Sequence, residues 1–135
     1  MHYLRSTLIL ALALTPMFVA SEALADKCKS PKIVVKNDRS STIKVKKIQY
    51  YDGCNNKWRT EDVPNKEIKS GHSHTFTNNL EYVENCPVSK FKLFRAVRKD
   101  SGSKYGDFKW GAVLKPDGGT KVCRTGTTYT IHAFE

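Results

Sequence analysis

The sequence predicts an all-β domain, a small antiparallel β-sandwich, immunoglobulin-like or related, with about eight short strands and two disulfides. Three observations support this. Apolar and polar residues alternate with a period of two in several segments. Turn-forming residues recur at intervals of roughly 8–12 residues. No window of about 11 residues has the periodicity of a helix.

The first 25 residues are predicted to be a cleaved signal peptide. Arg5 supplies a positive n-region, Leu8–Ala20 an apolar h-region, and Ala23–Ala25 the small-x-small pattern that signal peptidase recognises. The apolar stretch is shorter than the roughly 20 residues of a membrane-spanning helix. We therefore expect cleavage after Ala25 and a secreted or periplasmic domain of residues 26–135, monomeric and without a transmembrane segment.

Four cysteines follow the signal peptide, and an oxidising compartment allows them to pair. Their wide spacing does not resemble the closely spaced ligand pairs of zinc sites. We predict two structural disulfides among Cys28, Cys54, Cys86 and Cys123. Pairing of sequence neighbours closes the shorter loops and favours Cys28–Cys54 with Cys86–Cys123, although four cysteines allow three connectivities.

The first strands are expected to form a hairpin over Lys32–Tyr51. Its second strand begins at 42–46, where charged and apolar residues exchange at every position. The apolar phase then shifts by one residue, which predicts a β-bulge at Lys46-Lys47. Turn-forming residues at 37–41 separate the two strands.

Alternation and turn signals predict the remaining strands. A short segment around Trp58 precedes the break at Pro64-Asn65, and His72, His74 and Phe76 alternate with polar residues. The second clear strand covers Lys90–Val97. Further strand-forming segments lie at 105–114, 122–123 and 127–134.

Positive charge is concentrated in two segments. Lys27–Lys47 has eight basic residues and one acidic residue, and Lys90–Lys109 has seven and two, whereas Ile48–Ser89 has four and six. The formal net charge of the whole chain is +10. Alternating lysines on two strands of one sheet would form a basic stripe that attracts polyanions.

We therefore expect an exported binding module without catalytic activity. Its partner is expected to be an anionic glycan, lipopolysaccharide or another anionic membrane surface, nucleic acid, or an acidic protein. No cofactor or metal is expected. The residues expected to bind the partner are basic side chains of the two charged segments and two aromatic residues that stack on it: Lys44, Lys46, Lys47, Lys90, Lys92, Arg95, Arg98, Trp58 and Tyr51.

Two alternatives stay open. A secreted ribonuclease-like hydrolase would use His132 with His72 or His74 to exchange protons at a ribose hydroxyl and a leaving oxygen. The same three histidines are the side chains that a copper or zinc ion would use. An inhibitor or effector is the second alternative, and its strongly basic surface would require an acidic target.

Overall fold

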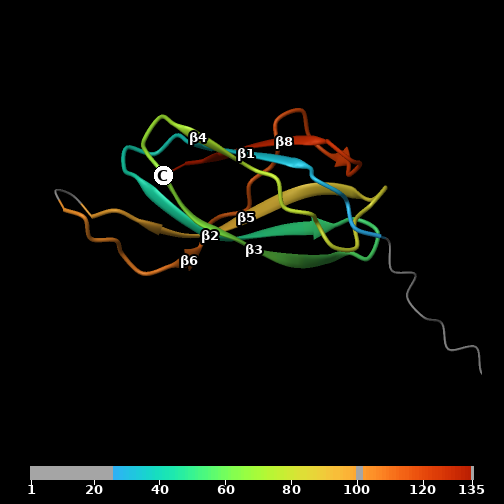
Figure 1. Cartoon of the computed structure of the whole chain (residues 1–135), viewed down its shortest axis with the longest axis horizontal. Coiled ribbons are helices and arrows are strands. Elements are labelled where there is room, and N and C mark those ends of the chain that lie inside the picture. The colour runs from blue at the N-terminus through green and yellow to red at the C-terminus, as the bar shows by residue number, and fades with distance from the viewer. Residues whose placement is uncertain (1–25, 100–101, 135) are drawn as a thin grey trace, which may run out of the picture.

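The structure is a computed structural model that describes residues 26–99 and 102–134 (Figure 1). The expected signal peptide, residues 1–25, lies outside the described residues. The described part of the chain has no helix, and so none that is long and apolar enough to span a bilayer. Its strands are β1 (Lys32–Asn37), β2 (Ile43–Asp52), β3 (Lys57–Ile68), β4 (Ser73–Phe76), β5 (Pro87–Val97), β6 (Lys109–Trp110), β7 (Lys121–Val122) and β8 (Thr128–Ala133).

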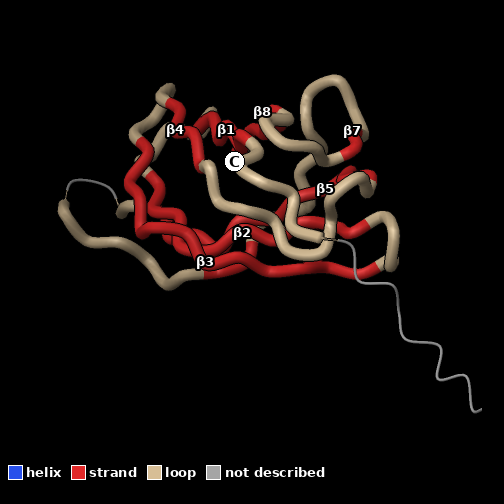
Figure 2. Tube along the Cα trace, turned by 45° about the vertical axis from the view of Figure 1, so that its right-hand side comes forward, coloured by secondary structure: helices blue, strands red, loops and turns tan. Residues whose placement is uncertain are grey.

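The strands form two sheets that face each other as two layers (Figures 1 and 2). The smaller sheet has the order β4-β1-β8, and the larger has the order β3-β2-β5-β6, with β7 also paired to β5. Neighbouring strands are antiparallel except for β1 and β8, which run parallel. The all-β, sandwich-like fold is thus confirmed, while its immunoglobulin-like form stays a prediction.

The core lies between the two layers and is built from every second residue of the long strands. In β2 and β5, for example, Ile48 pairs with Leu93 and Tyr50 with Phe91, and all four are buried. Their neighbours in sequence point to the opposite side of the larger sheet. The residues between the buried ones therefore form the outer side of the larger sheet.

The predicted hairpin over Lys32–Tyr51 is wrong, because β1 and β2 belong to different sheets. The turn residues between them carry the chain from one layer to the other. The buried side chain of Asn37 stabilises this corner: its Nδ2 donates to the carbonyl oxygens of Ser41 at 2.9 Å and Ile68 at 2.8 Å. Turn chemistry alone does not distinguish a hairpin from a crossing between layers.

The bulge predicted at Lys46-Lys47 is confirmed, since the register of β2 against both neighbours shifts between Val45 and Lys47. The break expected at Pro64-Asn65 is absent, and β3 runs through Pro64. Pro64 is tolerated because β3 is an edge strand and Pro64 lies at the register shift between Asp62 and Lys66, where it pairs with no residue of β2.

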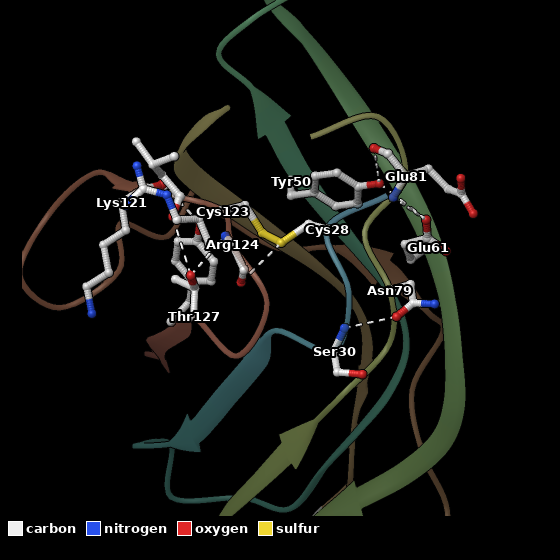
Figure 3. Close-up of a disulfide and its surroundings, with 12 residues drawn as sticks. Cys28, Ser30, Tyr50, Glu61, Asn79, Glu81, Lys121, Cys123, Arg124 and Thr127 are labelled. Atoms are coloured by element: carbon white, nitrogen blue, oxygen red, sulfur yellow. Dashed lines mark hydrogen bonds between the residues drawn. A yellow bond between two sulfur atoms is a disulfide. The ribbon is translucent and has the colours of Figure 1, made fainter. Parts of the chain in front are cut away.

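Both disulfides form, but the expected pairing is wrong: the bridges are Cys28–Cys123 and Cys54–Cys86. Figure 3 shows the first bridge, which joins the segment before β1 to the segment after β7. The parallel pairing of β1 with β8 brings these distant segments together. The entropy of loop closure rises slowly with loop length, so the preference for short loops is weaker than the effect of strand order. Two disulfides fit an oxidising, extracellular or periplasmic setting.

Candidate anion-binding face

The outer side of the larger sheet carries most of the basic residues that the sequence singled out. Between the buried pairs, other pairs of residues lie opposite each other on neighbouring strands. They are Gln49 with Lys92, Tyr51 with Trp58, and Lys47 with Phe94. These pairs alternate with the core pairs along the strands, so they project away from the core.

The β-bulge in β2 increases the number of lysines on this side. Val45 and Ile48 are both buried, so the two residues between them are free to leave the core. Lys46 is exposed and Lys47 is half-buried. A regular strand has one outward position between two inward ones, whereas this strand has two.

Five lysines of this side each lie over an aromatic ring. The distance from Nζ to the ring centroid is 4.4 Å for Lys44 over Tyr105, 5.5 Å for Lys46 over Phe108 and 6.0 Å for Lys47 over Phe94. It is 4.9 Å for Lys90 over Tyr51 and 4.5 Å for Lys92 over Trp58. We call these ten residues the lysine–aromatic face.

The rings of the lysine–aromatic face also contact one another. Tyr51 and Trp58 meet edge to face at 5.4 Å between centroids. Phe94 contacts Phe108 at 5.6 Å and Trp110 at 5.1 Å. Four of the five rings thus form two clusters, Tyr51 with Trp58 and Phe94 with Phe108, and a ring beneath an ammonium group restricts the rotamers of that lysine.

Acidic residues lie near one edge of this face, on β3. Lys47 Nζ lies 3.6 Å from Asp62, whose side chain is largely exposed. Tyr105 donates its hydroxyl to Glu67; this hydrogen bond, ahead of the charge of Lys44, lowers the pKa of Glu67. Burial and the same carboxylate raise the pKa of Tyr105 to about 12. No ion pair is formed by Lys44, Lys46, Lys90 or Lys92 within the described residues.

Of the two expected arginines, only Arg95 lies apart from the lysine–aromatic face. Arg95 pairs with the buried Val45, which places it on the inner side of the sheet. Arg98 is exposed just beyond the end of β5, forms a β-bridge with Tyr105 of the face, and donates its Nε to the carbonyl of Gly102. The structure therefore brings eight of the nine expected binding residues together and separates Arg95 from them.

Trp58 and Tyr51 do not present bare ring faces for stacking. Each ring already carries a lysine ammonium group, Lys92 on Trp58 and Lys90 on Tyr51. The two rings therefore act as supports for cations in this structure.

Sequence reasoning missed Phe94, Tyr105 and Phe108 as members of this face. The alternation of β5 carried a signal for Phe94, which falls on the same side as Lys92 although it is apolar. No comparable signal marked Tyr105 and Phe108, because they lie in the irregular segment between β5 and β6.

The histidines of the alternatives are not brought into one site. His132 lies opposite Lys36 in the sheet, and His74 lies opposite Val35. Consecutive residues of β1 point to opposite sides of the sheet, so His74 and His132 do so too. His72 precedes β4 and is exposed. Both ring nitrogens of His132 face carboxylates, Nδ1 that of Asp38 and Nε2 that of Asp117 at 2.9 Å.

Within residues 26–99 and 102–134, one group of three potential metal ligands has its donor atoms close together: Asp52, Cys54 and Cys86. Both cysteines are joined in a disulfide, which leaves no thiolate to bind an ion. The Asp52 carboxylate is already bonded to Arg59 and Asn55. This cluster is therefore structural.

Comparison with known proteins adds no relative: no protein-family model, no curated protein and no solved structure matches this chain.

Proposed function

We propose that this chain is an exported, non-catalytic binding module whose lysine–aromatic face recognises an anionic polymer or an anionic surface. The observation that carries the proposal is that five lysines on one sheet face each lie over an aromatic ring. Cleavage after Ala25 and secretion or release to the periplasm belong to the same proposal.

The physical argument concerns the entropy of binding. A free lysine side chain loses rotamer freedom when it contacts an anion, which reduces its contribution to affinity. A ring that holds the ammonium group in place lowers this cost before the partner arrives. Lys46, Lys90 and Lys92 form no ion pair in the described part of the chain, so none has to break first for these three. Lys44 lies opposite Glu67 on β3 but makes no close ion pair with it.

Among anionic partners, the arrangement favours one with sulfate, phosphate or carboxylate groups along an extended chain or surface. Anionic glycans and lipopolysaccharide have this chemistry. Nucleic acid offers phosphates too, but the ammonium groups on Trp58 and Tyr51 occupy the ring faces that unpaired bases would use. We therefore place an anionic glycan first.

The test is retention of the oxidised domain, residues 26–135, on immobilised heparin across a salt gradient. One variant replaces Lys44, Lys46, Lys90 and Lys92 by Gln. A matched control replaces four exposed lysines outside the face, Lys29, Lys69, Lys99 and Lys115, and so removes the same charge. We expect the face variant to elute at clearly lower salt than the control, because the lysines of the face act together.

Equal elution of the two variants would contradict the proposal, since only net charge would then matter. RNA incubated with the unmodified domain provides the second readout. Intact RNA is expected; cleavage that His132→Ala abolishes would instead support the hydrolase alternative.

A further inference from the structure

A separate cavity of about 220 Å³ lies on the inner side of β5, between that strand, the segment that follows β6, and the end of β8. The side chains that line it are apolar except for one guanidinium group. The apolar part comes from Leu93, Ala112, Val113, Leu114 and Phe134, and the charged group is Arg95. The lysine–aromatic face is on the opposite side of the same sheet.

The cavity wall leaves space for the Arg95 guanidinium. Gly111 lies directly against it: a Cβ at this position would lie 3.3 Å from Nε and 3.5 Å from Cζ of Arg95. A side chain at position 111 would therefore press on the guanidinium. In the described residues no carboxylate forms an ion pair with Arg95.

A second guanidinium group strengthens the positive potential at this cavity. Arg39 Nη1 donates to the carbonyl of Phe134 at 2.8 Å, and its buried Nε has no hydrogen-bond partner in the described part of the chain. Burial and the charge of Arg39 lower the pKa of Arg95. Two like charges held near each other, neither of them in an ion pair with a carboxylate of residues 26–99 or 102–134, favour a bound anion.

The apolar rim of the cavity is exposed to solvent. Val113 is 47% exposed and Phe134 61%, and both line the cavity. A ligand that covers apolar side chains at such exposure removes their surface from water, which favours its binding. The occupant therefore has to be apolar at the rim and anionic at Arg95.

We propose that this cavity binds a small monocarboxylate with one apolar group, its carboxylate on the Arg95 guanidinium and its apolar part against Val113, Leu114 and Phe134. The size fits, since a closed apolar cavity of roughly 150 Å³ accepts benzene, and this one offers about 220 Å³. Arginine suits a carboxylate because its planar fork donates two parallel hydrogen bonds.

The experiment is a titration of the oxidised domain, residues 26–135, with 4-methylbenzoate and with octanoate, followed by calorimetry or amide chemical shifts. The two probes distinguish an aromatic from a linear apolar group. The neutral isostere 4-methylbenzamide reports what the charge contributes. We expect saturable binding of at least one carboxylate and at least about tenfold weaker binding of the amide, because a charged hydrogen-bonded pair is lost.

Two variants locate the binding. Arg95→Gln is expected to weaken carboxylate binding by at least about tenfold, and Val113→Ser weakens it without touching the guanidinium. The matched control Lys99→Gln removes one exposed charge elsewhere and leaves binding unchanged. Circular dichroism confirms that each variant is folded.

Three results would overturn this proposal: no saturable binding of either carboxylate, equal binding of the amide, or full affinity in a folded Arg95→Gln variant. The four-lysine variant of the lysine–aromatic face should bind the small carboxylate normally. A result that contradicts carboxylate binding in the cavity is thereby distinguished from one that contradicts anion binding by the lysine–aromatic face.

Discussion

Asp52 and Arg59 form a buried ion pair at the end of the larger sheet, with Nε of Arg59 donating to Oδ2 of Asp52 at 2.9 Å and Nη2 lying 2.8 Å from the same oxygen. The Asp52 side chain is fully buried and that of Arg59 is 12% exposed. Burial alone would raise the pKa of Asp52, but hydrogen bonds from Asn55, Arg59 and the backbone N–H of Cys54 outweigh it and lower the pKa. The carboxylate thus organises the turn that holds the Cys54–Cys86 disulfide.

Breaking this pair is expected to destabilise the fold strongly. Asp52→Ala leaves the Arg59 guanidinium buried without its partner, which typically costs about 3–5 kcal/mol. Urea unfolding of the oxidised domain measures the loss. The exposed pair Lys47–Asp62 is the control, and Asp62→Ala should cost about 1 kcal/mol or less. Similar losses of unfolding free energy in the two variants would show that the buried pair contributes no more to stability than the exposed one.

A pH dependence is expected from His132. Hydrogen bonds with Asp117 and Asp38 raise the pKa of His132 above its ordinary value. The folded state therefore gains stability from the protonated ring below the unfolded pKa of about 6.5, and loses this gain as the pH rises through the higher folded pKa. The difference in unfolding free energy between the unmodified domain and His132→Gln should shrink from about pH 6 to pH 9. A constant difference over that range would contradict the assignment, and His72→Gln, at an exposed position, is the control.

Gly53 is expected to tolerate no side chain. A Cβ there would lie 2.5 Å from the carbonyl oxygen of Pro87, which also accepts the N–H of Gly53 at 2.9 Å. Gly53→Ala must push two backbones apart, and we expect a loss of about 1–3 kcal/mol. The control is Gly102→Ala, whose Cβ would meet nothing closer than 3.7 Å. Thermal unfolding of the two variants should separate them clearly.

The two disulfides are expected to differ in their contribution to stability. The Cys28–Cys123 bridge closes a loop with a sequence separation of 95, and Cys54–Cys86 one of 32. On the chain-entropy model these contribute about 4.7 and 3.7 kcal/mol. Replacing each pair by serines should therefore cost about 1 kcal/mol more for the longer loop. Peptide mapping without reduction checks the pairing itself.

The rings beneath the lysines are expected to contribute to anion binding without adding charge. Trp58→Leu removes the ring under Lys92 and should weaken heparin binding about two- to fivefold, the equivalent of one exposed cation–π contact. Trp110→Leu is the matched control, because that ring packs on Phe94 and no described lysine lies over it. Equal loss in both variants would mean that the rings act only through general packing.

Local patterns predicted the strands well and their connections poorly. The period-two alternation located β2 and β5, and the phase shift at Lys46-Lys47 located the bulge. Which strands become neighbours depends on contacts far apart in sequence, such as those of Asn37 with Ile68, and no local pattern encodes them. The hairpin and the disulfide pairing were wrong for this shared reason.

The candidate face was predictable where it lay on regular strands. Lys44, Lys90 and Lys92 were expected on the solvent side because they alternate with apolar residues, and the structure places them there. Arg95 was included for its charge, although its alternation with Leu93 already placed it toward the core. Tyr105 and Phe108 reach the face from an irregular segment, where side-chain direction has no period to predict it.

The parallel pairing of β1 with β8 has a consequence for synthesis, in which the chain emerges from its N-terminus. When Cys28 and β1 emerge, both of their final partners, Cys123 and β8, are still about a hundred residues away in the chain. The next cysteine to emerge after Cys28 is Cys54, which is not its partner in the finished domain. The smaller sheet is therefore complete only after β8, the last strand, has been synthesised. A factor that keeps the chain unfolded until then would suit this topology.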